Sequence, residues 1–144
     1  MKLLLLTIGR PKLAYARAGI DEYLGRLRGA VEWTALKSGP RDEEGARLLA
    51  ASEGCFRVVL DETGKSPNSR QLADQWTAWE NRALHKVAFL IGGADGHAPT
   101  LKVRADWTWS LSPLTLQHEL AAVVVLEQLY RAHTLRTGHP YHRD

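Results

Sequence analysis

The chain has 144 residues and a mass of 16.1 kDa, enough for one domain with its own core and too little for a second domain. Hydrophobic residues make up 44% of it and charged residues 24%, which excludes disordered, fibrous and disulfide-scaffold proteins. The net charge of +3 is compatible with an anionic partner but does not identify one.

Strands and helices alternate through the first half of the chain. The apolar run 2–8 predicts a buried strand rather than a signal peptide, because it is short and no small-residue cleavage site follows it. Apolar residues at helical spacing predict a helix over 13–27, and alternating residues predict a strand over 31–36. A second helix is expected over 41–53.

The third expected strand, 55–60, contains the only cysteine of the chain. Cys55 has no partner for an internal disulfide, so we expect a reducing, cytoplasmic location. No apolar stretch reaches the length of a bilayer span, and we therefore expect no membrane association.

The second half continues the alternation. We expect a helix over 67–82, a strand over 86–91, a short helix near 99–105, a strand over 107–111 and a last helix over 116–136. Alternation of this kind indicates an α/β fold: a mostly parallel sheet of five or six strands flanked by helices, in one domain over 1–144.

Ligands of open α/β sheets bind beyond the carboxyl ends of the strands, so the loops after Leu60, Ile91 and Leu111 are the places to look. The glycine cluster 92–96 lacks Cβ atoms, which allows a ligand to approach its backbone closely. An ordinary tight turn explains the same glycines equally well.

The connection between the last strand and the last helix is unusually apolar, since it reads Leu-Ser-Pro-Leu-Thr-Leu over 111–116. Apolar side chains beside free backbone groups suit a flat heteroaromatic ring such as adenine. The alternative is a loop buried under a neighbouring segment.

The last helix and the tail carry three further signals. Residues 120–126 are apolar on every side, which predicts burial against both the domain and another subunit. Glu127 and Arg131 are four residues apart and share a helix face, as a catalytic or a purely structural pair. The tail mixes basic and aromatic residues suited to RNA, namely Arg136, His139, Tyr141, His142 and Arg143. A solvated terminus is the alternative. Its histidines lack a carboxylate or cysteine at ligand spacing, so we expect no metal.

At these residues the sequence resembles a known family. The segments FLIGGADG at 89–96, WSLSPLTLQHEL at 109–120 and LEQLYRAHTLRTGHPYHRD at 126–144 are similar to RlmH, the family of pseudouridine N3-methyltransferases of large-subunit rRNA. The opening KLLLLTIGR and AGIDEYLGRL at 18–27 also fit, so the resemblance spans nearly the whole chain.

The resemblance implies a SPOUT-class methyltransferase domain with a C-terminal trefoil knot, which is an exception to the general absence of knots. It implies S-adenosylmethionine as cofactor, a homodimer, and 23S rRNA on the assembled ribosome as partner, with no DNA. The positions that match the cofactor site are Leu60, Gly92, Gly93, Leu111, Ser112, Pro113, Leu114, Thr115 and Leu116.

For catalysis the matched tail motif implies roles rather than a fixed assignment. His142 or Tyr141 would lie near the target base, and Arg143 or Arg131 would stabilise charge on its carbonyl oxygens. Glu127 would orient Arg131. We expect alignment of the two reactants to supply most of the rate enhancement. No metal is needed for this transfer.

The sequence departs from the family at three places. Gln117 stands where a proline usually precedes the histidine, Ala122 takes the place of an arginine, and the region around 38–46 is short. These departures concern RNA docking more than the cofactor site. Two other functions stay open: a non-enzymatic RNA- or ribosome-binding module, and a SPOUT enzyme acting on tRNA, which the absence of an appended RNA-binding domain disfavours.

Overall fold

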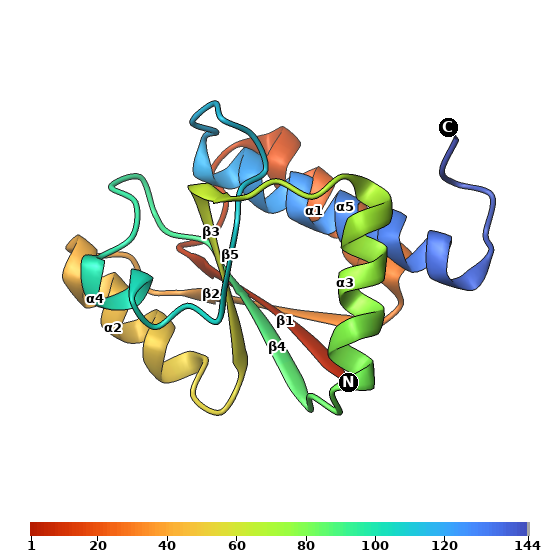
Figure 1. Cartoon of the computed structure of the whole chain (residues 1–144). Coiled ribbons are helices and arrows are strands. Elements are labelled where there is room, and N and C mark those ends of the chain that lie inside the picture. The colour runs from red at the N-terminus through yellow and green to blue at the C-terminus, as the bar shows by residue number, and fades with distance from the viewer. Residues whose placement is uncertain (144) are drawn as a thin grey trace.

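A computed structural model describes residues 1–143, so Asp144, the end of the expected domain and of the matched tail motif, lies outside the described residues. Its centre is one five-stranded sheet in the order β2-β1-β4-β3-β5 (Figure 1). All neighbouring strands pair in parallel, which confirms the predicted parallel α/β architecture. The strands are β1 (Lys2–Ile8), β2 (Val31–Leu36), β3 (Phe56–Lys65), β4 (Lys86–Leu90) and β5 (Trp107–Trp109).

The helices form two layers on either side of this sheet (Figure 1). One layer holds α1 (Ala14–Leu27), α3 (Ser69–Asn81) and α5 (His118–Thr137), with α5 packed between the other two. The other layer holds α2 (Arg41–Ala51) and α4 (Pro99–Lys102), which contact each other. Helices on both faces bury the central strands β1 and β4, and this explains why these two strands are nearly continuous apolar runs.

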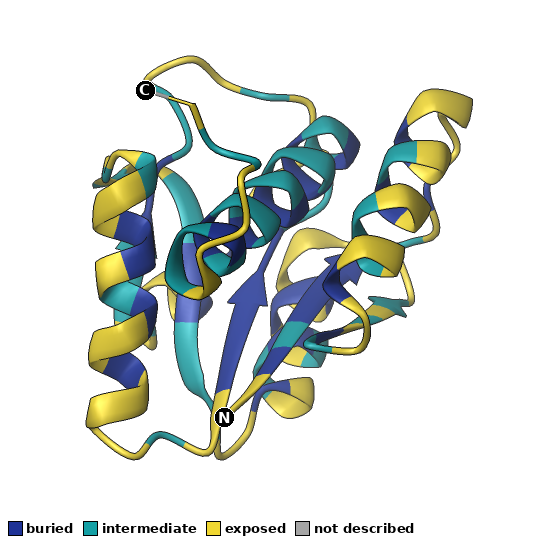
Figure 2. Ribbon diagram, turned by 90° about the vertical axis from the view of Figure 1, so that its right-hand side faces the viewer, coloured by how far each residue is buried: buried dark blue, intermediate teal, exposed yellow. Residues whose placement is uncertain are grey.

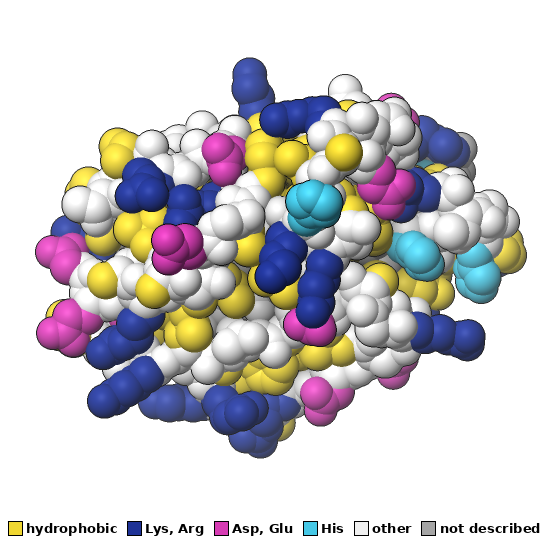
Figure 3. All heavy atoms as spheres, turned by 90° about the horizontal axis from the view of Figure 1, so that it is seen from below, with side chains coloured by type: hydrophobic (Ala, Val, Ile, Leu, Met, Phe, Trp, Pro, Cys, Tyr) yellow, Lys and Arg dark blue, Asp and Glu magenta, His cyan; other side chains and the backbone are white. Residues whose placement is uncertain are grey.

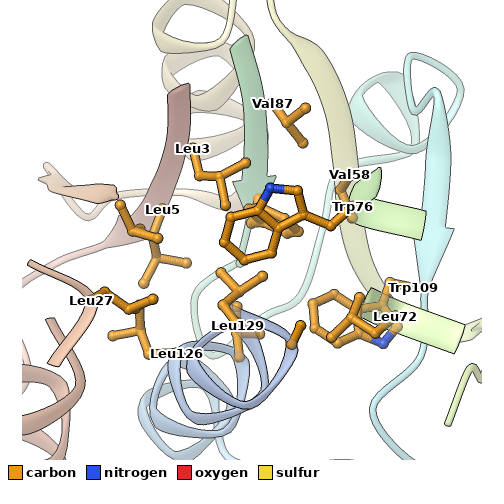
Figure 4. Packing of buried hydrophobic residues seen from close by; sticks show 14 of the residues in the cluster. Leu3, Leu5, Leu27, Val58, Leu72, Trp76, Val87, Trp109, Leu126 and Leu129 are labelled. Carbon is orange, nitrogen blue, oxygen red and sulfur yellow. The ribbon is translucent and has the colours of Figure 1, made fainter. Parts of the chain in front are cut away.

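The main core lies between the sheet and the α1–α5–α3 layer (Figure 4). Leu3 and Leu5 of β1 face Leu126 and Leu129 of α5, and all four side chains are fully buried. Trp79 of α3 packs edge-on against Phe89 of β4, with ring centroids 5.9 Å apart. A smaller cluster under α2 and α4 fills the opposite face of the sheet.

Helix α5 is the most enclosed helix of its layer. Helices α1 and α3 are yellow along their outer sides in Figure 2, whereas α5 is mostly teal and dark blue. A Cβ added to Gly19 of α1 would lie 2.9 Å from Val123 of α5, so the two helices pack closely there. Yet Leu120, Val123 and Val124 stay only half-buried. The chain's own fold therefore leaves part of the apolar α5 surface uncovered.

Two helix starts have clear side-chain causes. Asn68 caps α3 through a reciprocal pair of hydrogen bonds with Gln71, which fixes the start of this helix at Ser69. Gln117 caps α5, because its side-chain oxygen accepts from the backbone N–H groups of Glu119 and Leu120. The glutamine that departs from the family pattern thus takes over the helix N-cap.

Strand β3 differs from the prediction. The sequence placed its end at Leu60 and a turn at Asp61–Gly64, but the strand continues to Lys65. The register with β5 shifts between Leu60 and Lys65, and a Cβ on Gly64 would overlap the carbonyl of Thr108. Because Gly64 has no side chain, the chain passes this irregularity against β5 and goes on as a strand.

The trefoil knot implied by the resemblance stays a prediction. The segments it would involve do lie close together. The N–H of Ser110, after β5, donates to the carbonyl of Lys65 at the end of β3, at 2.7 Å. The Thr115 hydroxyl donates to Glu62 Oε2 at 2.6 Å.

Candidate active site

A cavity of about 300 Å³ opens at the carboxyl ends of β3, β4 and β5, where the topology predicts a ligand site. The structure brings eight of the nine predicted cofactor residues to its lining: Leu60, Gly92, Gly93, Leu111, Ser112, Leu114, Thr115 and Leu116. The ninth, Pro113, is exposed and lies outside the lining. Strand β3 and two loops, far apart in sequence, therefore form one wall, and Leu60 contributes from within the strand rather than from a loop after it.

Two positions of the glycine loop, Gly92 and Gly93, have little room for a side chain. A Cβ on Gly92 would lie 3.0 Å from the backbone of Gly96, and one on Gly93 would lie 2.8 Å from the carboxylate of Glu44. Gly96 has a φ of +75°, and its N–H donates to the carbonyl of Gly93 at 3.0 Å. The loop is thus a tight turn and a cavity wall at once, and the two interpretations offered by its sequence are compatible.

The apolar loop after β5 is held by its own serines. Ser110 Oγ donates to the carbonyl of Ser112 at 3.0 Å, and Ser112 Oγ accepts from the N–H of Leu114 at the same distance. Leu114 is 73% exposed at the cavity edge. The loop is therefore not buried under another segment of the chain.

An acidic rim that the sequence analysis missed borders the cavity on the β3 side. The Asp61 carboxylate accepts from the hydroxyl and the N–H of Thr63 at 2.6 and 2.9 Å, and pairs with Lys102 Nζ at 3.0 Å. Burial alone would raise the pKa of Asp61, but the bonds from Thr63 and Lys102 together lower it to about 2. Asp61 therefore carries a negative charge at the cavity.

His97 is a second residue that the sequence analysis missed, and it lies just beyond the glycine cluster. It is buried in the cavity wall, with Nε2 at 3.1 Å from the carbonyl oxygen of Leu60. A carbonyl only accepts, so Nε2 carries the proton. Burial lowers the pKa of His97, which keeps the ring neutral and ties the end of β3 to the glycine loop. A histidine after a glycine cluster gives no sequence signal for this contact.

The predicted catalytic residues meet at the other end of α5. Glu127 Oε1 accepts from Arg131 Nη2 at 2.7 Å and from the Tyr141 hydroxyl at 3.0 Å. Arg131 Nη1 lies 3.2 Å from His142 Nδ1. We call Glu127, Arg131, Tyr141 and His142 the tail cluster. Arg143 is exposed, and within residues 1–143 it makes no hydrogen bond or ion pair.

These contacts decide which atoms of the cluster donate and which accept. A guanidinium only donates, so His142 Nδ1 accepts the hydrogen bond from Arg131. Burial, together with the neighbouring Tyr23 and Glu127, raises the pKa of Tyr141. Tyr141 therefore keeps its hydroxyl proton and donates it to Glu127.

The cavity and the tail cluster lie apart within one chain. His118 lines the cavity near the start of α5, and Arg131 follows 13 residues later on the same helix. At about 1.5 Å per residue this places them roughly 20 Å apart along the helix axis. Figure 1 shows the tail at the opposite end of α5 from the loop that precedes this helix. The structure thus does not bring the two sets of predicted site residues together in one protomer.

The surface carries mixed charges. On the face drawn in Figure 3, Lys and Arg side chains lie both near the centre and along the outline, with Asp and Glu among them, so this face does not stand out as a nucleic-acid surface. Residues 1–143 contain no group of three or more His, Cys, Asp or Glu side chains placed to hold a metal ion. Across the same residues, no helix is both long enough and apolar enough to cross a bilayer.

Comparisons with known proteins agree with this geometry. A protein family described as "Predicted SPOUT methyltransferase" matches residues 1–142. The chain is 48% identical to a "Ribosomal RNA large subunit methyltransferase H" of Thermus thermophilus, over 99% of both chains. It is 44% identical to the protein of the same name from Sorangium cellulosum, over 98% of this chain and 99% of that protein.

Solved structures share the fold at low sequence identity. A methylase family protein from Haemophilus influenzae superposes with a TM-score of 0.62 at 12% identity, over 99% of this chain and 70% of that one. A tRNA (m1G37) methyltransferase from Aquifex aeolicus superposes with a TM-score of 0.57 at 14% identity, over 91% of this chain and 70% of that one. At these identities the likeness concerns the fold alone.

Proposed function

The chain belongs to the SPOUT methyltransferase family, and from this premise we propose that it transfers a methyl group from S-adenosylmethionine to N3 of a pseudouridine in 23S rRNA of the assembled ribosome. The observation that carries the proposal is the cavity at the strand ends, lined by the glycine and apolar loops, in a chain whose full-length relatives are named as large-subunit rRNA methyltransferases. An rRNA substrate also implies a cytoplasmic location.

The residues of the cavity fit S-adenosylmethionine. Leu60, Leu111 and Leu116 give an apolar wall for an adenine ring, and the bare backbone at Gly92 allows close approach. Asp61 and Glu62 place carboxylates beside the cavity, where a cationic methionine portion would lie favourably. When bound there, S-adenosylmethionine would supply an electrophilic methyl group on its sulfonium.

The tail cluster would act on the RNA base. When N3 of pseudouridine loses its proton, negative charge spreads onto the two neighbouring carbonyl oxygens. The N–CH₃ bond would then form as the S–CH₃ bond of the sulfonium breaks, and the bonding electron pair would stay on the sulfur of the departing thioether. Arg131, held by Glu127, is a donor that stabilises such charge, and His142, bonded to Arg131, would lie beside the base. Because the Tyr141 hydroxyl keeps its proton, it would orient the base rather than deprotonate it, and the N3 proton would leave to water.

A homodimer would unite the two regions. The tail cluster of one protomer lies about 20 Å from its own cavity along α5, so the partner's tail must complete each site. The half-buried Leu120, Val123 and Val124 give α5 an apolar surface that a second copy would cover. Tyr15 of the neighbouring helix α1 is 55% exposed and adds a further exposed aromatic side chain to the same helix layer.

The proposal is tested by incubating the purified protein with methyl-labelled S-adenosylmethionine and ribosomes that lack the modification. We expect label in 23S rRNA, recovered as N3-methylpseudouridine by nucleoside mass spectrometry, and little label on naked 23S rRNA. Label on tRNA alone would contradict the proposal and assign a tRNA enzyme. Salt-sensitive ribosome binding without cofactor binding or methylation would contradict it in favour of an RNA-binding module.

A further inference from the structure

The tail folds back onto helices α1 and α5, and Tyr141 packs against side chains of both helices. The ring of Tyr141 packs edge-on against that of Tyr130, with centroids 4.7 Å apart. The guanidinium carbon of Arg131 lies 4.7 Å from the centre of the Tyr141 ring. Residues 137–140, which lead into Tyr141, are all exposed. The position of Tyr141 therefore decides where the adjoining His142 lies.

Arg26 of α1 supports this arrangement from the other side. Its guanidinium carbon lies 5.5 Å from the ring centres of both Tyr23 and Tyr130, and 6.0 Å from that of Tyr141. One cation thus faces three tyrosine rings that come from α1, from α5 and from the tail. Cations are attracted to the faces of aromatic rings, so Arg26 links the three segments.

The guanidinium of Arg26 is itself fixed in place. Its Nε donates to Glu22 Oε2 at 2.8 Å, one helical turn earlier on α1. Tyr23 and Tyr130 also lie near each other, with ring centroids 6.2 Å apart, and complete the platform under Tyr141. We call Tyr23, Arg26 and Tyr130 the tail platform.

We propose that Arg26 is a positioning residue for the C-terminal tail: it keeps Tyr141 on the tail platform, so that Arg131 and His142 face the RNA base in a fixed arrangement. The proposal rests on the proposed methyltransferase function. Arg26 acts through Tyr141 and does not touch the substrate, and it lies outside the lining of the cofactor cavity. Its loss should therefore affect turnover and leave cofactor binding unchanged.

The variants Arg26→Met and Arg26→Lys test this proposal, with Arg17→Met as the matched control because Arg17 is an exposed arginine on the same helix. In Arg26→Met we expect kcat on ribosomes to fall about ten- to hundred-fold, as a misplaced catalytic group does, with the Kd for S-adenosylmethionine within about two-fold of wild type. Arg26→Lys keeps the charge without the flat guanidinium and should be intermediate. Arg17→Met should behave as wild type.

Amide hydrogen exchange of residues 138–143 gives a readout that needs no catalysis. It should become faster in Arg26→Met and stay unchanged in Arg17→Met, while the core strands exchange at the wild-type rate. A wild-type kcat for Arg26→Met, or a lowered kcat with unchanged tail exchange, would overturn the proposal. A wild-type protein that methylates nothing would instead refute the proposed function, and the exchange data would still show whether Arg26 holds the tail.

Discussion

The cavity at the strand ends and the tail cluster are built in opposite ways. The cavity is made by backbone turns at the strand ends, and its central positions are glycines where a Cβ would meet neighbouring atoms at about the closest distances seen in proteins. The tail cluster is made by side chains alone, which bind one another across α5 and the tail. The first region is shaped by the fold. The second depends on a few polar contacts that single substitutions can remove.

This difference suits two separate roles, cofactor binding at the cavity and action on the RNA base at the tail cluster. A rigid cavity suits a cofactor of constant shape, whereas a cluster at the end of the chain can be presented to a second protomer and a large RNA. If so, changes in the two regions should affect different steps. The following predictions test that separation, from the largest expected effect to the smallest.

Deleting residues 139–144 should abolish methylation and leave the Kd for S-adenosylmethionine within about two-fold of wild type. The deletion removes Tyr141 and His142 but touches no residue of the cavity lining. Filter-binding methylation assays and isothermal titration measure the two effects. Normal turnover by the truncated protein would refute the assignment of the tail.

Replacing Gly92 by Trp should weaken binding of S-adenosylmethionine by at least about a hundred-fold, because a side chain there meets Gly96 and His97 and fills the cavity. Gly25→Ala is the matched control, since a Cβ on Gly25 meets nothing within 4 Å. The control should bind the cofactor normally and be slightly more stable, by about 0.5–1 kcal/mol. Wild-type affinity in Gly92→Trp would place the cofactor elsewhere.

Glu127→Gln should lower kcat about ten-fold with little change in cofactor affinity, because the carboxylate that holds both Arg131 and Tyr141 loses its charge. The same change should lower the pKa of Tyr141, since the Glu127 carboxylate helps to raise it. Ultraviolet difference spectra between proteins with Tyr141 and the same proteins carrying Tyr141→Phe assign that titration to Tyr141. An unchanged kcat would make the Glu127–Arg131 pair purely structural.

Asp61 provides a pH test on the cavity side. Its pKa is about 2 in the folded protein against an ordinary value of 3.8, so the unfolded chain binds the proton more tightly. The carboxylate therefore stabilises the fold above pH 3.8, and this contribution is lost as the pH falls from 3.8 towards 2. Denaturant unfolding should show wild type more stable than Asp61→Asn at pH 6, with the gap shrinking over that range. A constant gap would contradict this assignment.

Local pattern was sufficient to predict most of the fold. Apolar runs and, over 31–36, alternating residues predicted all five strands, and helical spacing predicted the helices between them. The strand order β2-β1-β4-β3-β5 could not be predicted in this way, because it depends on contacts between distant segments. The continuation of β3 past Asp61 was missed because Gly64 and its neighbours read as a turn, whereas pairing with β5 keeps them extended.

The residues of the candidate site likewise fall into those that local sequence pattern predicts and those whose roles depend on packing. Position at strand ends and glycine content were enough to select the cavity loops, and the tail residues came from the matched motif. His97 and Arg26 were missed, because their roles arise from packing: one touches the carbonyl of Leu60, the other three tyrosine rings. Neither contact leaves a periodic or compositional signal in the chain.

Subunit complementation tests most directly whether the cavity of one protomer works with the tail of the other. Gly92→Trp protein has an intact tail, and the 139–144 deletion has an intact cavity; each should be inactive alone. After unfolding and refolding together, half of the dimers should be mixed and carry one complete site, so activity should return to about a quarter of wild type. If the mixture stays inactive although mixed dimers form, cavity and tail do not act across the interface.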